Sequence, residues 1–154
     1  MTAFQPIPLS NTWPLWERGK HFELGHVLNS VVTDLLQPSQ IGTLGLHHAA
    51  CWECDLSDDS LIWSGGVYDI FGLPRWAKVR REEAVALYCE DSRAIMERLR
   101  AYAIKHRRGF TVDVEIRAGG MSRRWMRLLA APVCRGDRVV GLKGLKQDIS
   151  REYA

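Results

Sequence analysis

The last third of the chain alternates apolar and polar residues with a period of two. Single polar residues separate four apolar positions: Phe110, Val112, Val114 and Ile116. This alternation predicts a strand with one buried and one exposed face. Further strands are predicted over residues 124–134 and 138–147, because Gly119-Gly120 and Arg135-Gly136-Asp137 are typical turn sequences.

Two shorter strands are predicted earlier in the chain, over residues 51–56 and 61–64. The segment between them, Ser57-Asp58-Asp59-Ser60, has the composition of a tight turn. Five strands in this arrangement, with helices between the second and the third, indicate an α+β domain with a five-stranded antiparallel sheet.

Three helices are predicted between the second and third strands, over residues 67–71, 81–88 and 93–107. The longest has an apolar face that contains Ile95, Leu99, Tyr102 and Ala103. Asp91 or Ser92 is expected to cap its start, and Gly109 to end it.

The N-terminal part is predicted to be a tail followed by a helical extension. Residues 1–12 are polar and contain Pro6 and Pro8, whereas residues 13–36 have a helical pattern. One stripe of this helix holds four apolar residues: Leu24, Leu28, Val31 and Leu35. The stripe could form a short coiled-coil seam or could cover the sheet. The expected division is therefore an extension over residues 1–49, for dimerisation or capping, and a domain over residues 50–152.

Composition supports an ordinary globular protein of one domain. The 154 residues are 46% hydrophobic and 25% charged, and the formal net charge is +3. No apolar run approaches the ~20 residues of a membrane span. Met1 to Ser10 lack the basic start and apolar core of a signal peptide, so a cytoplasmic location with reduced cysteines is expected.

Six short motifs occur in the same order as in one known family of domains. They are Trp52 and Asp55 with Ile62-Trp63-Ser64; Tyr68-Asp69-Ile70-Phe71-Gly72; Glu90-Asp91-Ser92-Arg93; Phe110 with Glu115-Ile116-Arg117; Arg124-Trp125-Met126; and Gly141 and Gly144 with Asp148-Ile149-Ser150. The chain resembles the PAS domain with an attached PAC motif over residues 50–152. Two departures are that Cys89 stands near the usual histidine and that the usual proline is missing.

The resemblance implies a bacterial-type sensor or interaction domain in signal transduction, and not an enzyme. Such a domain would enclose a small apolar pocket between the sheet and helix 93–107. The candidates for its lining are Trp63, Phe71, Tyr88, Met96, Leu99, Val112, Val114, Met126 and Leu142. These residues could equally be ordinary core. The domain could be the excised sensor of a larger protein or a single-domain regulator.

A second hypothesis is a ligand-free homodimerisation or docking module for a partner protein. In this case the stripe of Leu24, Leu28, Val31 and Leu35 is the dimer interface, and a C₂ dimer is expected. Leu28→Asp would then produce a soluble monomer.

No cofactor is required by the sequence, although haem and a non-covalently bound flavin stay open. Cys51 and Cys54 have the CxxC spacing of redox and zinc sites, but on a strand their side chains point to opposite faces, and no second pair follows. Met96 and His106 are candidate haem ligands on the long helix, and His21, His26, His47 and His48 could also be metal or haem ligands. The reactive-cysteine motif of flavin photoreceptors is missing.

The remaining sequence features are weak evidence for a binding or catalytic site. Basic residues cluster at Lys78-Val79-Arg80-Arg81, at Lys105-His106-Arg107-Arg108 and at Arg123-Arg124. A phosphate-bearing effector could bind where such clusters converge, but solvated surface also explains them. Neither a nucleic-acid-binding motif nor a catalytic motif is present in the sequence.

Overall fold

The structure is a computed structural model that describes residues 25–28, 49–119 and 121–153. Its strands form one antiparallel sheet in the order β1-β4-β5-β6-β2-β3. The strands are β1 Gly25–Leu28, β2 Ala49–Asp55, β3 Ser60–Trp63, β4 Gly109–Ala118, β5 Ser122–Arg135 and β6 Arg138–Asp148. The helices are α3 Gly65–Phe71, α4 Arg81–Ala86, α5 Glu90–His106 and the 3₁₀ helix η3 Ser150–Tyr153.

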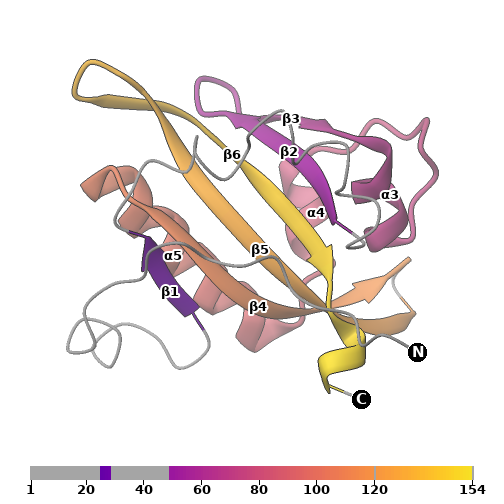
Figure 1. The fold of residues 1–154 in the computed structure, drawn as a ribbon. Coiled ribbons are helices and arrows are strands. Elements are labelled where there is room, and N and C mark those ends of the chain that lie inside the picture. Colours follow the sequence, from indigo (N-terminus) through magenta and orange to yellow (C-terminus); the bar gives the residue numbers. More distant parts are fainter. Residues whose placement is uncertain (1–24, 29–48, 120, 154) are drawn as a thin grey trace.

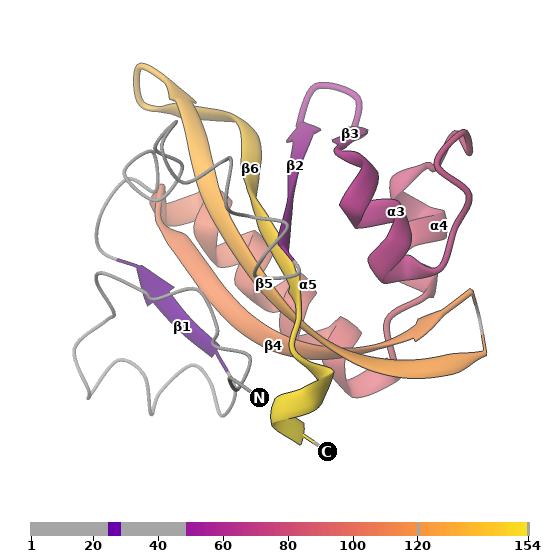
Figure 2. The ribbon, with the colours of Figure 1, turned by 45° about the vertical axis from the view of Figure 1, so that its right-hand side comes forward.

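The longer helices lie on one side of the sheet. Figures 1 and 2 show α5 behind β4 and β5, with α3 and α4 beside the β2–β3 hairpin. None of the helices in the described ranges is long and apolar enough to cross a bilayer.

The predicted five-stranded sheet is confirmed as β2 to β6, and the period-two pattern of β4 is confirmed with it. Alternate residues of β2, β4, β5 and β6 face the helices and form the core. On β4 the residues of this inner face are buried: Phe110, Val112, Val114 and Ile116. Leu99 and Ala103 of α5 pack against them, as the apolar face of that helix predicts.

The helical extension predicted over residues 13–36 is wrong at residues 25–28, which form strand β1 on the outer edge of β4. Gly25 lies opposite Val112 and Leu28 opposite Gly109. Pairing at this edge uses N–H and C=O groups of β4 that would otherwise lack partners, and Gly25 is a poor residue for a helix interior. The helical stripe therefore does not include Leu28. Its other members, Leu24, Val31 and Leu35, lie outside the described residues.

The predicted ends of α5 are also corrected. The helix begins after Cys89, not after Asp91 or Ser92, and no side chain caps it. Ser92 lies in the first turn, where its hydroxyl oxygen accepts a hydrogen bond from the Glu115 N–H at 2.8 Å. The helix ends at His106, the C-cap residue Arg107 has a left-handed φ of 55°, and Gly109 is already part of β4. The Ser92 hydroxyl thus binds the neighbouring strand β4 and does not cap the helix.

Asp113 connects the outer face of the sheet to η3. Its carboxylate accepts two hydrogen bonds from the Arg127 guanidinium, at 2.7 and 2.9 Å, and one from the Tyr153 hydroxyl, at 2.6 Å. The Tyr153 ring stacks on Trp125 with 4.1 Å between the centroids. Partial burial and this carboxylate raise the pKa of Tyr153 to about 12.

We expect Asp113→Asn to lower the free energy of unfolding by about 1–2 kcal/mol, because a half-buried bidentate ion pair is lost. The pKa of Tyr153 should fall towards its ordinary value, since the neighbouring negative charge is removed. Urea unfolding measures the first effect, and the pH-dependent tyrosinate absorbance, with Tyr153→Phe as reference, measures the second. The matched control is Glu115→Gln, which breaks only an exposed 3.4 Å contact with Arg123. Equal effects of the two variants would contradict this role of Asp113.

Candidate ligand-binding site

A cavity of about 60 Å³ lies inside the core, between the sheet and helices α4 and α5. Its walls come from β2, β3, α4, the α4–α5 connection, α5, β4, β5 and β6. The lining residues are Trp52, Cys54, Leu61, Trp63, Arg81, Ala84, Val85, Tyr88, Met96, Arg100, Phe110, Leu128, Leu142 and Lys146. The cavity is thus largely apolar, with a few polar groups.

The structure brings four of the nine predicted pocket residues together around this cavity: Trp63, Tyr88, Met96 and Leu142. The other five are buried core residues outside its lining: Phe71, Leu99, Val112, Val114 and Met126. Phe71 lies just behind the wall, because its ring stacks on Trp63 with 5.0 Å between centroids.

Lys146 is the most unusual residue of the cavity, because it is a lysine on the inner face of the central strand β6. Only 6% of its surface is exposed. Its ammonium group donates a hydrogen bond to the Tyr88 hydroxyl at 2.9 Å. The amine also lies 4.9 Å from the ring centroid of Phe71, 5.4 Å from that of Trp52 and 5.5 Å from that of Tyr88. Within the described ranges, no carboxylate forms an ion pair with it.

Burial, with the positive charge of Arg81 as a second cause in the same direction, lowers the pKa of Lys146 from the usual 10.5 to about 7. The same burial raises the pKa of Tyr88 well above its ordinary value. The phenol therefore stays protonated. The site can hold Lys146 as an amine or as an ammonium ion near neutral pH, with the Tyr88 hydroxyl as its hydrogen-bond partner.

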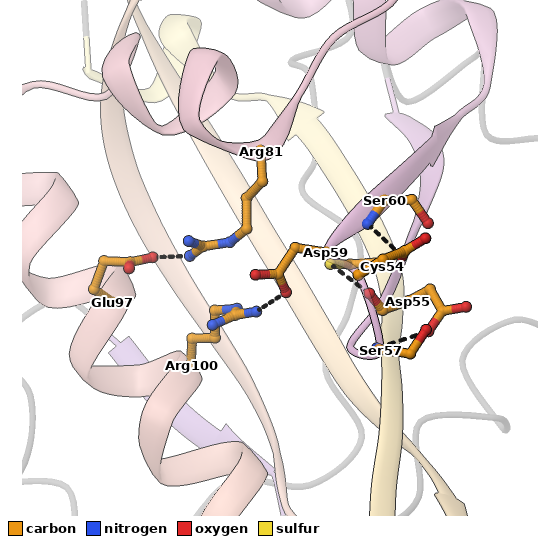
Figure 3. A network of polar contacts seen from close by, with 9 residues as sticks. Cys54, Asp55, Ser57, Asp59, Ser60, Arg81, Glu97 and Arg100 are labelled. Atoms are coloured by element: carbon orange, nitrogen blue, oxygen red, sulfur yellow. Dashed lines mark hydrogen bonds and ion pairs between the residues drawn. The ribbon is translucent and has the colours of Figure 1, made fainter.

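Two arginines form the more exposed side of the cavity. Figure 3 shows Arg81, from the start of α4, and Arg100, from α5, with their guanidinium groups close together and directed at different carboxylates. Arg81 pairs with Glu97, and Arg100 pairs with Asp59 of the β2–β3 turn at 3.0 Å. Together these pairs connect both helices to the hairpin.

Sequence reasoning missed Arg100 and Lys146 because it considered only apolar residues for the pocket, and it named Arg81 only as a member of the basic cluster Lys78-Val79-Arg80-Arg81. A signal for Lys146 was present, since it shares the inner face of β6 with Leu142, four residues earlier. Arg100 follows Met96 by one helical turn and so faces the same way. Only the tertiary structure brings Arg81 to them.

The CxxC pair behaves as strand geometry predicts. Cys54 faces the cavity and is buried, whereas Cys51 is half-buried and belongs to the other set of alternating positions on β2. Burial raises the pKa of both thiols, so neither is activated as a thiolate. Within the described ranges, no group of three or more histidine, cysteine or acidic residues could hold a metal ion.

No protein-family model matches the chain, and no curated protein matches it. Solved structures do. A sensory box histidine kinase/response regulator from Burkholderia thailandensis superimposes with a TM-score of 0.63 at 14% identity, over 72% of this chain and 84% of that one. The protein has the PAS fold.

Two further structures show the same PAS fold. The N-terminal domain of a diguanylate cyclase with a PAS/PAC sensor from Marinobacter aquaeolei matches with a TM-score of 0.63 and 15% identity, over 69% of this chain and 99% of that one. An RNA-binding light-oxygen-voltage receptor matches with a TM-score of 0.60 and 14% identity, over 68% of this chain but only 30% of the receptor. The resemblance deduced from the six motifs is therefore confirmed at the level of the fold.

Proposed function

We propose that this PAS-fold chain is a sensor domain of a signal-transduction protein and that it binds a small ligand in the core cavity. The observation that carries the proposal is the cavity itself, which combines apolar walls with the buried Lys146 amine and Tyr88 hydroxyl. Apolar pockets with a few convergent polar groups are the usual form of small-molecule sites. Solved structures of the same fold come from a histidine kinase and a diguanylate cyclase, whose names describe sensor proteins.

The proposed mechanism is a change in how the helices pack on the sheet. A ligand in the cavity would touch Arg81 on α4, Arg100 on α5 and Lys146 on β6. It would therefore favour the arrangement in which all three elements are positioned to contact it, and would shift the population of conformers accordingly. Binding alone, without catalysis, is proposed, and the response would pass to a partner protein or an attached effector domain.

Dimerisation is a second candidate function. Two large apolar side chains outside the core favour it, since Trp76 is 84% exposed and Ile62 is 66% exposed. Exposed aromatic and aliphatic residues are common at protein interfaces. A homodimer that lacks a ligand would fit this alternative.

The ligand hypothesis predicts an extra mass in native mass spectrometry of protein purified without refolding. The mass should be stoichiometric and should disappear on denaturation. Ala84→Leu, which fills the cavity from α4, should abolish it, whereas Ala86→Leu on the exposed side of the same helix should not. An ultraviolet-visible spectrum would identify a coloured ligand.

The bare-chain mass, together with no change in melting temperature across a library of small metabolites, would contradict the ligand hypothesis. A dimer of bare-chain mass under those conditions would favour the docking module. Circular dichroism establishes that both alanine variants are folded.

A further inference from the structure

We infer that the ligand of this cavity is a small organic carboxylate, whose charge meets Lys146 and the two arginines and whose short hydrocarbon part meets the apolar walls. The inference rests on the proposed function and names its ligand class.

Among the described residues, the cavity walls carry basic groups and no acidic ones. Arg81, Arg100 and Lys146 all line the cavity, whereas its described lining contains neither an aspartate nor a glutamate. Basic side chains on three different elements converge on one small space, so that an anion inside would face positive charge from several directions. Electrostatic complementarity of this kind selects the sign of the ligand's charge.

The carboxylates that pair with the two arginines in the described ranges lie at the rim of the cavity. The side chains of Glu97 and Asp59 are 40% and 50% exposed, whereas those of their partners Arg81 and Arg100 are 19% and 20% exposed. The two acids therefore neutralise the arginines from the solvent side. When Lys146 is protonated, the three basic side chains face two carboxylates, and the charge of Lys146 is the one left unbalanced.

Lys146 has no carboxylate partner in the part of the chain that the structure describes, although a buried ammonium ion normally has one. A buried charge is costly unless it is paired, and a hydroxyl and three aromatic faces compensate only in part. A carboxylate next to the amine would supply the missing negative charge.

The size and polarity of the cavity narrow the ligand further. Pockets for drug-sized ligands have about 300–1,000 Å³, whereas a single water needs about 10–15 Å³. A cavity of about 60 Å³ thus suits a molecule of a few heavy atoms. Trp63, Val85 and Leu142 provide hydrocarbon and aromatic contacts that inorganic phosphate could not use. A short-chain carboxylate can contact the apolar lining with its hydrocarbon part and the basic side chains with its charged group.

Binding of such an anion should be coupled to a proton. The groups that influence Lys146 are Tyr88 between α4 and α5, Arg81 on α4 and Cys54 on β2, with Glu97 paired to Arg81. In the empty site, burial and Arg81 favour the neutral amine above about pH 7. A bound carboxylate favours the ammonium form, so the complex takes up a proton and the affinity falls as the pH rises.

The test compares butyrate with butyramide, which has nearly the same shape but no charge, by isothermal titration calorimetry. At about pH 6 we expect butyrate to bind the wild-type protein at least about tenfold more tightly than butyramide, because one buried charge pair forms. The affinity for butyrate should fall about tenfold between about pH 6 and pH 8.5, while butyrate itself stays ionised.

Three variants show which side chains cause the preference for butyrate and its pH dependence. Lys146→Met should remove the preference for butyrate and its pH dependence. Lys143→Met, at an outer-face position of the same strand, should leave both unchanged. Arg100→Gln, whose partner Asp59 is exposed, should weaken butyrate about tenfold and provides a second readout should Lys146→Met fail to fold.

Equal binding of butyrate and butyramide would overturn the carboxylate inference and leave the sensor proposal intact. Tighter binding of inorganic phosphate than of butyrate would also overturn it. If neither butyrate nor butyramide binds, the inference fails, and the native mass spectrum then decides separately whether the sensor proposal fails with it.

Discussion

Replacing Gly144 with alanine is expected to prevent stable folding, because the new methyl group would overlap the main chain of β5. A Cβ atom at this position would overlap the Leu129 carbonyl oxygen and lie 2.7 Å from the Leu129 carbonyl carbon. Gly144 is in the central strand β6, opposite Ala130 of β5 and Trp52 of β2, so neither neighbour can move away without breaking the ladder. We expect a loss of more than about 3 kcal/mol, which is a large part of the stability of a small domain.

The matched control is Gly136→Ala in the turn between β5 and β6. Gly136 has a φ of 63° but nothing lies within 4 Å of its added Cβ atom, so only backbone strain of about 1 kcal/mol is expected. Urea unfolding followed by circular dichroism compares the two. Two variants of similar stability would show that the strands can separate at Gly144 and that close approach there is not essential.

Lys146→Met is expected to stabilise the protein at neutral pH and to lose this advantage as the pH rises. In the folded state the pKa of Lys146 is about 7, against 10.5 in the unfolded state. Between these values the unfolded chain binds more protons than the folded chain, so the wild-type free energy of unfolding increases with pH. The cost of the buried lysine is thus greatest at about pH 7 and below.

From the two pKa values, this cost should decrease by about 3 kcal/mol between about pH 7 and pH 9.5. The measured quantity is the difference in free energy of unfolding between wild type and Lys146→Met, from urea denaturation at both pH values. Taking this difference cancels the titration of the cysteine thiols. For Lys143→Met, the difference in free energy of unfolding from wild type should be the same at both pH values. A constant difference for Lys146→Met would mean that the folded protein keeps this lysine protonated throughout.

If both expectations about Lys146 hold, the residue lowers stability in order to bind. Methionine would give the more stable but insensitive domain, since it fills the same space without a charge. Such an exchange between stability and activity is common at functional sites.

The strands could be predicted from the sequence because each buries one face. On β4 every second residue is apolar, and a slip of one position would expose the whole set. The helix boundaries were less predictable. Ser92 was a good candidate for a cap, but its hydroxyl binds the Glu115 N–H on β4, a partner 23 residues away. The N-terminal segment shows the same limit, because pairing with β4 decided the structure of residues 25–28.

Only part of the candidate site could be predicted, because the position of a residue around the cavity depends on tertiary structure. Hydrophobicity identifies residues that are buried, such as Val114 and Met126, but it does not show which of them border a cavity. The charged side chains of the site could not be recognised as cavity lining for a second reason. A lysine at position 146 looks like a surface residue until the inward register of β6 is considered.

The walls of the cavity differ in how firmly they are held. Helix α4 has six residues, and Ala84 is its only buried one, whereas α5 has seventeen residues and packs along β4. Local opening costs least where little apolar surface is buried, so α4 is the wall that opens first. In the proposed sensor, exchange of the ligand with solvent would then be limited by local opening of this short helix. The Arg81–Glu97 pair ties this helix to α5, and Glu97 is the member of the pair outside the cavity lining, so the rate of response in the proposed sensor would be tuned at Glu97 without altering the lining.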